Sequence, residues 1–328
     1  MKKFIAKRLC LSIVILFFVS FIIYSIERCL PTSYVEAKAM EMSQKAGAKP
    51  IDELLGELNE KYGLDGNIVT GYFQWLSNAV RGEFGDSWKH NVPVTEKFST
   101  VIWYSFALGA VAFILQVGLA IPLGILSARK QYSKTDYAIT VFGLIGISLP
   151  TFFFATILKW VFSIQLGWFD LFGMVGRNHQ TLSQAGKILD IAHHLVLPVA
   201  TLTIVGIGSL MRYTRTNMLE VLNSDFIRTA RAKGLPENRV IHYHAFRNTL
   251  IPIVTILGGS LPGLFSGAMI TETLFQIEGI GYTSYQSLTS GDIPFTMFYM
   301  TFLAVLTLMG TLLADILYAV VDPRVRMN

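Results

Sequence analysis

Long apolar runs, separated by polar and charged connections, recur along the whole chain. The hydrocarbon core of a bilayer is about 30 Å thick, and a helix needs roughly 20 mostly apolar residues to cross it. Six runs reach that length and predict an all-α membrane protein with six transmembrane helices. The predicted helices are Leu9–Ile26, Val101–Leu126, Tyr137–Val161, Ile191–Met211, Ile251–Thr271 and Thr296–Val321.

The first apolar run follows a basic start, which is also typical of a secretory signal peptide. A signal peptide has an apolar region of roughly 7–15 residues that ends in small residues. This run is longer and ends in Tyr24 and Ile26. We therefore expect it to be retained as an anchor helix.

Lys and Arg gather in alternate connections, which predicts the orientation because positive charge is retained on the cytoplasmic side of short loops. The connection Glu272–Pro294 carries three acidic residues and no Lys or Arg, so we place it outside. Both termini are then expected in the cytoplasm. The chain is predicted to be a multi-pass protein of the cell membrane, which is the inner (cytoplasmic) membrane where a cell has two. The expected cytoplasmic pieces are Met1–Arg8, the turn with Arg129, Lys130 and Lys134, the segment Arg212–Leu250, and the tail with Arg324 and Arg326.

This topology divides the chain into three parts: residues 1–26 with the cytoplasmic start and first helix, an extracytoplasmic helical segment 27–100, and a five-helix core 101–328. Two stretches of the second part have helical periodicity, with Trp75 and Trp88 close by. Amphipathic helices with Trp are typical of the membrane interface. Either capping of the spans or docking of a partner would explain them. The periodic positions are Ile51, Leu54, Leu55, Leu58 and Tyr62, and Ile68, Tyr72, Leu76 and Val80.

Composition supports a membrane location. With 52% hydrophobic and 15% charged residues among 328, and a mean hydropathy of +0.49, the chain cannot cover itself with an ordinary soluble surface. The net charge of +5 needs no nucleic acid to explain it, because the basic residues lie in the predicted cytoplasmic loops. Cys10 and Cys29 lie near opposite ends of one predicted helix, roughly 30 Å apart, and cannot pair within the chain.

A polar segment between the fourth and fifth spans predicts a helix, a sharp turn and a second helix. Three residues that favour helix N-caps, Asn223 to Asp225, precede about two helical turns over Phe226–Lys233. Gly234 occupies the position where a left-handed residue ends a helix. Pro236 suits the first turn of the next helix, with Glu237 favourable at its positive end.

The short helix carries an apolar stripe, which we expect to comprise Leu219, Leu222, Phe226 and Ala230. A helix of this length is marginal alone in water, so something must pack against it, and a soluble partner protein is the natural candidate. Two other interpretations remain open. A DNA-binding helix-turn-helix would need a free domain, and a plain solvated basic loop would serve only the orientation rule.

Several stretches resemble one family in collinear order over nearly the whole chain. RTARAKG followed by LIP resembles the cytoplasmic "EAA loop" of binding-protein-dependent ABC import permeases, in the branch that serves dipeptides, oligopeptides and nickel. The similarity continues in MRYTRTNMLEVLNSDFIRTARAKGL, KYGLDGNIVTGYFQWLSNAVRGEFGDS, SLPTFF, ITETLFQIEGIG and DILYAVVDPRVR.

The resemblance implies a type I ABC importer permease fold, with a cytoplasmic coupling helix in the loop 212–250 that sits in a groove of an ATPase subunit. It also implies the partners: a second homologous permease, two cytoplasmic ABC ATPase subunits and an extracytoplasmic solute-binding protein, within membrane lipid. The residues implied for the ATPase-coupling loop are Asp225, Arg228, Thr229, Ala230, Arg231, Ala232, Lys233, Gly234 and Leu235.

The chain has no Gly-x-x-x-x-Gly-Lys-Ser/Thr phosphate loop. We therefore expect no ATPase activity and no cofactor bound by this chain, with ATP and Mg²⁺ held by the partner subunits. His193 and His194 are adjacent, and His242 and His244 are two apart, so neither pair has the i, i+4 spacing of a metal site on one helix face. We predict no catalytic and no metal-binding residues.

Polar and helix-breaking residues inside the spans are candidates for the pathway or its gate, with ordinary helix kinking as the alternative. Gly263 and Gly267 form a small-xxx-small pair suited to close helix contact, within the chain or with a partner permease. For Asp315 we expect an interfacial partner such as Arg, and for Lys159 a side chain that reaches toward the membrane surface. The candidate pathway residues are Ser148, Pro150, Thr151, Thr201, Ser260 and Ser266.

The resemblance implies a permease subunit of an ATP-driven importer that carries short peptides delivered by an extracytoplasmic binding protein. The same role for nickel or another small solute is the alternative cargo. A self-contained secondary transporter should show paired broken helices and more ionisable residues within the membrane than Asp315 and Lys159. An intramembrane enzyme would need a catalytic constellation that the sequence does not show.

Overall fold

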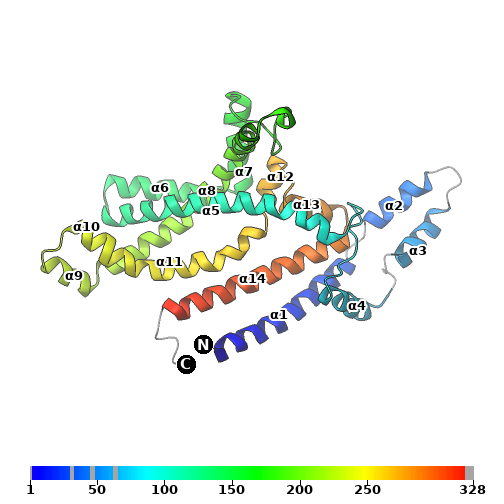
Figure 1. The fold of residues 1–328 in the computed structure, drawn as a ribbon, viewed down its shortest axis with the longest axis horizontal. Coiled ribbons are helices and arrows are strands. Elements are labelled where there is room, and N and C mark those ends of the chain that lie inside the picture. The colour runs from blue at the N-terminus through cyan, green and yellow to red at the C-terminus, as the bar shows by residue number, and fades with distance from the viewer. Residues whose placement is uncertain (1, 30–32, 45–48, 62–65, 322–328) are drawn as a thin grey trace.

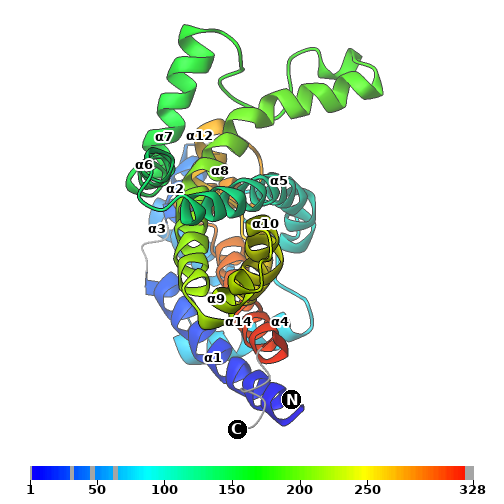
Figure 2. The ribbon, with the colours of Figure 1, turned by 90° about the vertical axis from the view of Figure 1, so that its left-hand side faces the viewer.

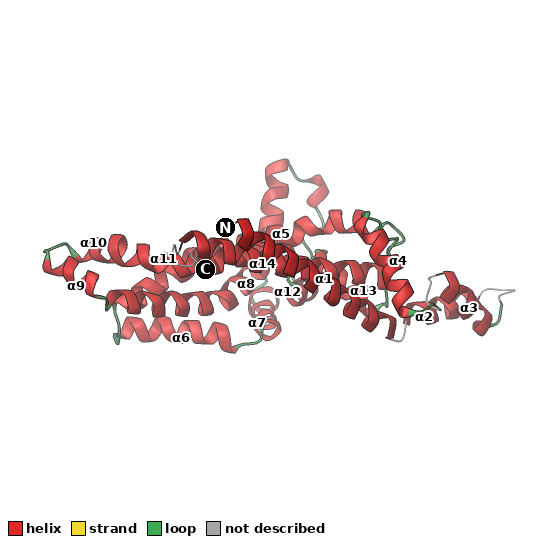
Figure 3. Cartoon of the chain, turned by 90° about the horizontal axis from the view of Figure 1, so that it is seen from below, coloured by secondary structure: helices red, strands yellow, loops and turns green. Residues whose placement is uncertain are grey.

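The computed structural model describes residues 2–29, 33–44, 49–61 and 66–321, and within these ranges regular structure is helical. Figure 3 shows the helices with no strand between them. Asp86 and Pro93 form an isolated antiparallel bridge in the described part of the chain. The all-α prediction is confirmed. Met1, Tyr62 and the tail with Arg324 and Arg326 lie outside the described residues.

Four helices in the described ranges are long and apolar enough to cross a membrane: α1 (Lys2–Cys29), α5 (Val94–Arg129), α8 (Gln184–Leu222) and α14 (Ile293–Val321). Two bent pairs bring the number of candidate spans to six if each pair counts as one. The first pair is α6 (Lys134–Ser148) with α7 (Thr151–Leu158) and a π-helical turn, Lys159–Gln165. The second pair runs from α10 (Glu237–Arg239) through a π-helical turn, Val240–Ala245, to α11 (Phe246–Ser260) and a 3₁₀ turn, Leu261–Phe265.

The third predicted span is not one continuous helix, and this corrects the sequence-based prediction. The two halves of the first pair differ in direction by 106°. Leu149 has extended backbone angles (ψ 128°), because the proline ring of Pro150 disfavours the helical conformation in the residue before it. In Figures 1 and 2, α7 and the first turns of α8 stand away from the remaining long helices.

The fifth predicted span also ends earlier than expected. The helix gives way to the 3₁₀ turn at Leu261, and Gly267 adopts a left-handed conformation (φ 80°) before a separate helix, α12 (Met269–Phe275), begins. Within this chain Gly263 has no atom near the position of an added Cβ, whereas a Cβ at Gly267 would lie 2.5 Å from the backbone nitrogen of Gly281. A contact of the pair with a partner permease stays a prediction.

Other glycines bring the long helices together. A Cβ at Gly208 of α8 would collide with the carbonyl oxygen of Gly143 in α6, and a Cβ at Gly310 of α14 would collide with that of Gly259 in α11. Small residues at such crossings let the backbones approach closely, which membrane helices need because lipid supplies no hydrophobic driving force between them. Figure 1 shows α5, α6, α8, α11, α14 and α1 running roughly side by side.

Three short helices follow α1: α2 (Ser33–Ser43), α3 (Ile51–Lys61) and α4 (Ile68–Val80). The two predicted amphipathic helices are thus confirmed, with Leu54, Leu58 and Tyr72 buried in one apolar cluster. The Tyr72 hydroxyl donates to the carbonyl of Phe17 at 3.0 Å, which fastens α4 to α1. The predicted boundary at residue 100 lies inside α5, which begins at Val94.

At the same end of the molecule, α12 and α13 (Ile280–Thr289) form a compact hairpin around a fully buried carboxylate. Glu272 accepts hydrogen bonds from the Ser105 hydroxyl at 2.7 Å and from the backbone N–H groups of Ala268 at 2.8 Å and Tyr282 at 2.9 Å. Hydrogen bonds to an ionised group are stronger than neutral ones. They hold the hairpin against α5.

We predict that Gly281→Ala destabilises this hairpin. The added Cβ would lie 2.7 Å from the backbone nitrogen of Met269, which cannot move without displacing α12. The expected loss is about 1–3 kcal/mol, as for other overpacked sites, seen as a lower Tm of the purified protein. Gly263→Ala is the matched control, since its Cβ meets nothing within 4 Å. Equal Tm values for the two variants would contradict the packing described here.

Candidate functional site

The polar segment at residues 223–245, which we call the elbow, lies at one end of the molecule in Figures 1 and 3. Its outermost element is α9 (Asp225–Ala232), followed by a tight turn and by α10, which continues through the π-helical turn into α11. The predicted order of short helix, turn and second helix is confirmed.

One face of α9 is buried against its own chain. Ile227 is 0% exposed and Ala230 is 7% exposed. They belong to an apolar cluster, here called the elbow core, to which α5, α8 and the π-helical turn contribute. Its buried members are Ile125, Ala128, Met218, Ile227, Ala230, Val240, Ile241 and Ala245. Burying an aliphatic side chain of this size stabilises by about 1.5–3 kcal/mol, which holds a helix too short to persist alone.

The predicted apolar stripe is wrong at one position. Phe226 is 48% exposed, and Ile227 takes the buried place. The stripe was extrapolated at helical spacing from Leu219 and Leu222, but α8 ends at Leu222 and α9 begins at Asp225. The intervening turn changes the direction of the chain, so the periodicity of α8 does not continue into α9.

The C-terminal end of α9 has the hydrogen bonds of a Schellman motif. The N–H of Gly234 donates to the carbonyl of Arg231 at 2.9 Å, and the N–H of Leu235 donates to that of Ala230 at 3.4 Å. Gly234 is left-handed, with φ 72°, as its position in the sequence predicts. The motif satisfies the last carbonyls of the helix and turns the chain back toward the bundle.

An ion pair closes the same turn. Arg231 donates to the two carboxylate oxygens of Glu237 at 2.8 and 3.2 Å. These hydrogen bonds to Glu237 are the main reason why the pKa of Arg231 lies above its ordinary value. Both side chains are about half exposed, so the pair contributes about 0–1 kcal/mol. Pro236 stands at the N-cap of α10, one position before the first turn in which we expected it.

The outward face of α9 is open to solvent in the described structure. It carries Phe226, Arg228, Thr229 and Ala232, and an Arg228–Asp225 contact of 3.4 Å at its edge. Lys233 and Gly234 are also exposed, and Leu235 is half-buried. Ala230 differs from the other residues predicted for this loop because it faces the elbow core. A surface of small residues around an exposed aromatic ring suits contact with another protein.

Behind the elbow, a buried ion pair joins three helices. Arg215 of α8 donates to Asp136 of α6 through Nε at 2.9 Å and through Nη2 at 2.8 Å. Asp136 also accepts from the Ser127 hydroxyl of α5 and, at 2.9 Å, from the N–H of Tyr132. This bidentate arrangement fixes the α5–α6 turn to α8. Ser127 adjoins Ala128 in the sequence, so the ion pair and the elbow core share the end of α5.

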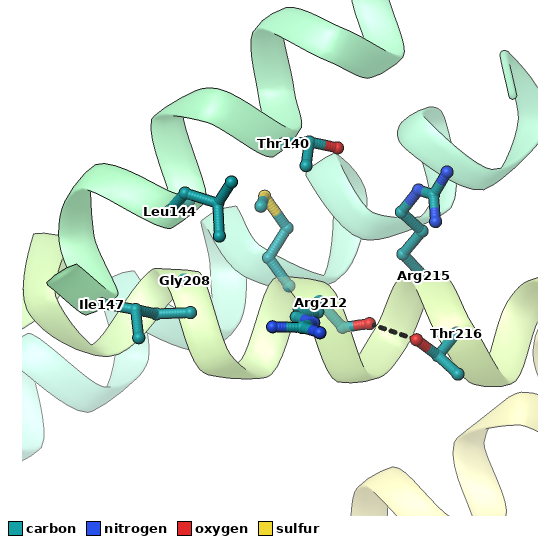
Figure 4. A pocket seen from close by; sticks show the side chains of 9 residues that line it. Thr140, Leu144, Ile147, Gly208, Arg212, Arg215 and Thr216 are labelled. Carbon is teal, nitrogen blue, oxygen red and sulfur yellow. Dashed lines mark hydrogen bonds between the residues drawn. The ribbon is translucent and has the colours of Figure 1, made fainter. Parts of the chain in front are cut away.

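A cavity of about 360 Å³ opens beside this ion pair, between α6 and α8 (Figure 4). Leu144 and Ile147 line one part of it, and Arg212, Arg215 and Thr216 line the other. The hydroxyl of Thr216 donates to the carbonyl of Arg212 at 3.0 Å, the contact dashed in Figure 4. Its lining therefore combines apolar side chains with two cationic ones, and in Figure 4 Arg212 lies between Ile147 and Thr216.

None of the candidate pathway residues lines this cavity: Thr201 is buried in the middle of α8, and the others lie at or beside helix breaks. Ser148 and Pro150 are exposed and Thr151 is half-buried at the bend before α7. The remaining three are hydroxyl residues that donate to carbonyls of their own turns. These bonds join Thr201 to Leu197 at 2.9 Å, Ser260 to Leu257 at 2.8 Å and Ser266 to Gly263 at 2.6 Å. Their assignment to a pathway stays a prediction.

The two charges inside the apolar runs have different partners. Arg8 Nη1 lies 3.1 Å from Asp315 Oδ2, so the predicted interfacial arginine partner is confirmed. For Lys159 the reach toward the membrane surface stays a prediction. Its ammonium group donates to the carbonyl of Leu274 at 2.6 Å and lies 4.0 Å from the ring centroid of Phe172. The carbonyl oxygen of Leu274 and the face of the Phe172 ring both attract this cation electrostatically.

Among the described residues, Asp170, His193 and His194 form a group whose ligand atoms lie within 4.8 Å of one another. Sequence reasoning missed it because it tested the histidines only against each other. Asp170 comes from the connection before α8, and no local spacing marks it as a neighbour.

Comparisons with known proteins agree on one family. The sequence profile described as "Binding-protein-dependent transport system inner membrane component" matches residues 120–327. The oligopeptide transport system permease protein AppB of Bacillus subtilis (strain 168) is 39% identical over 326 residues, 99% of each chain. The corresponding protein OppB of Haemophilus influenzae is 33% identical over 99% of this chain and 100% of its own. The di/tripeptide transport system permease protein DppB of Pseudomonas aeruginosa (strain UCBPP-PA14) is 32% identical over 99% of each.

The ion pair between Asp136 and Arg215 yields a stability prediction. Asp136→Ala leaves a partly buried guanidinium without its carboxylate, which should cost about 3 kcal/mol and lower the Tm of the purified protein. The double variant Asp136→Leu, Arg215→Met should recover most of this loss, because apolar side chains can replace a buried pair at little cost. If the single and double variants lost the same stability, the pair would not be the source of it.

Proposed function

Because the chain belongs to the binding-protein-dependent transport system inner membrane components, as an ABC importer permease with the type I fold, we propose that it carries short peptides across the cytoplasmic membrane. The peptide cargo is proposed from three full-length relatives that are named oligopeptide or di/tripeptide permeases. An extracytoplasmic binding protein delivers the peptide, and a second homologous permease completes the pathway.

The observation that supports the proposal most directly is the structure of the elbow. Its short helix α9 is buried on one face and exposed to solvent on the other. Two cytoplasmic ABC ATPase subunits supply the energy, and α9 sits in a groove of one of them. The outward residues Phe226, Thr229 and Ala232 make the contact. ATP and Mg²⁺ bind to the ATPase subunits, while this chain holds no cofactor for hydrolysis.

The proposed mechanism uses the contacts behind α9. When the ATPase pair closes, it displaces α9, and the elbow core passes that displacement to α5, α8 and the π-helical turn. The Asp136–Arg215 pair makes α6 move with them. The bundle then alternates between inward-open and outward-open states, with Ser148, Thr151, Thr201, Ser260 and Ser266 proposed along the pathway or its gate.

Charge supports the proposed orientation, with the elbow and both termini in the cytoplasm. The elbow contains Arg228, Arg231, Lys233 and Arg239, whereas the connection from Glu272 to Pro294 has no Lys or Arg. Basic residues are retained on the cytoplasmic side. In Figure 1 the elbow and the first turns of α1 lie toward one side, and α2, α3 and α13 toward the other.

The function is tested by peptide uptake into vesicles that contain this chain, the second permease and the ATPases, with the binding protein and a peptide outside. Uptake should require ATP inside. Gly234→Val should abolish uptake while ATP hydrolysis continues, because a β-branched residue is strained at φ 72° and misplaces α9. Gly234→Asn is the control, since Asn tolerates this conformation, and it should retain most uptake. Uptake that persists without the ATPases would contradict an ATP-driven importer.

Contact at α9 is tested separately by affinity capture of the ATPases. Ala232→Arg places a long cation on the outward face and should reduce ATPase capture by about tenfold or more, through a clash in a closely packed contact. Gln131→Arg adds the same charge at the exposed α5–α6 turn and should leave capture unchanged. Full capture by Ala232→Arg would place the ATPase contact elsewhere.

A further inference from the structure

The connection between the third and fourth spans folds back onto the start of α8. Asp170 lies in this connection, and His193 and His194 lie three turns into α8. The Asp170 Oδ2 atom is 3.2 Å from His194 Nε2 and 3.9 Å from His193 Nδ1. The carboxylate and the His193 ring are open to solvent, with 58% and 46% of their side chains exposed, while His194 is buried.

The other nitrogen of each ring is held by a backbone carbonyl. His194 Nδ1 lies 2.8 Å from the carbonyl oxygen of Asp190, and His193 Nε2 lies 3.0 Å from that of Trp168. Because a carbonyl only accepts, each of these nitrogens carries the ring's N–H. In a neutral imidazole the opposite nitrogen then has a lone pair. In neutral rings the lone pairs therefore belong to His194 Nε2 and His193 Nδ1, the ring nitrogens that lie 3.2 and 3.9 Å from Asp170 Oδ2.

This arrangement brings three acceptors together with no donor between them. With both rings neutral, these three acceptors cannot hydrogen-bond one another, so either a metal ion or an added ring proton must lie among them. The neighbouring Asp190 carboxylate does not line the site, because its Oδ1 lies 3.5 Å from His194 Nδ1, on the opposite side of the ring. It also accepts from the N–H of Gly176 at 3.0 and 3.2 Å and contacts His179 Nδ1 at 2.6 Å. These bonds instead fix the connection that carries Asp170 over the helix.

We propose that Asp170, His193 and His194 bind a divalent transition metal ion, with Zn²⁺ as the best fit, in a site that keeps an open position for water. Two imidazoles and one carboxylate are a ligand set that Zn²⁺ takes, and ligating histidines usually donate their second N–H to a carbonyl or carboxylate. Both histidines here have that support.

The geometry requires only a small closure. Zinc bonds of about 2.0–2.2 Å place neighbouring ligand atoms about 3.4 Å apart in a tetrahedron. Asp170 Oδ2 already lies 3.2 and 3.9 Å from the two ring nitrogens, and all three ligand atoms lie within 4.8 Å of one another. The remaining closure is a small movement of the exposed His193 ring toward His194. Since the metal would join the connection to the first turns of α8, binding stiffens the part of the chain that stands away from the other long helices in Figure 2.

The test uses the full chain, purified without a histidine tag in complex with its partner permease and ATPases. After dialysis against Zn²⁺ and then metal-free buffer near neutral pH, bound zinc is counted by mass spectrometry. The wild-type complex should hold one equivalent more than complexes with Asp170→Asn or His193→Gln. Co²⁺ in place of Zn²⁺ should give the visible absorption of a tetrahedral nitrogen and oxygen site, absent in both variants.

Two controls keep the result specific. The double variant His242→Gln, His244→Gln removes another neighbouring pair of histidines and should leave the zinc count unchanged. Asp170→Asn alters an exposed side chain, so its Tm without metal should equal that of the wild type. Added Zn²⁺ should raise the Tm of the wild type alone.

An equal zinc count in the wild type and Asp170→Asn would overturn the proposal. The proposal would also be overturned if a proton, rather than a metal ion, joined Asp170 to the histidines. In that case Zn²⁺ would leave the NMR titration curves of His193 and His194 unchanged. Because the readouts are metal content, absorption and Tm, they stand apart from peptide uptake. Failure of the proposed transport function would leave them unchanged.

Discussion

The attachment of α9 to the elbow core is the contact on which the remaining organisation depends. Eight residues cannot sustain a helix in water, so its shape and place are set by Ile227 and Ala230 inside a cluster that belongs to three other elements. The same cluster ends at Ala128, beside the ion pair of Asp136 and Arg215. A force on α9 therefore acts on packed helices rather than on a loose loop, since close-packed interiors transmit strain.

Buried polar groups mark the places where the long helices are joined by something other than apolar packing. Asp136 is satisfied by Arg215, Ser127 and a backbone N–H at one end of the bundle. At the other end, Glu272 is satisfied by Ser105 and two backbone N–H groups. A buried charge is tolerated only when it is paired or fully hydrogen-bonded, so each of these sites permits one arrangement of its neighbours.

The features that could be predicted from the sequence are those that depend on residues close together along the chain. Apolar length located the spans, and Gly234 was found because few other residues suit a left-handed helix end. Prolines were less informative: Pro122 and Pro198 lie inside continuous helices, whereas Pro150 accompanies a bend of 106°. Neighbouring helices decide whether a freed carbonyl is satisfied in place, and a single sequence does not reveal those neighbours. The approach of Asp170 to the histidines of α8 is likewise a property of the fold.

The contact between Arg8 and Asp315 joins helices at opposite ends of the chain, about three hundred residues apart. During synthesis α1 is made well before its ionic partner in α14, since Asp315 follows Arg8 by about three hundred residues. Contacts of such separation form late, because the intervening chain must be ordered before they can close. Every nascent intermediate that lacks α14 thus lacks this bridge, so the ionic closure between α1 and α14 is a late event in the assembly of the bundle.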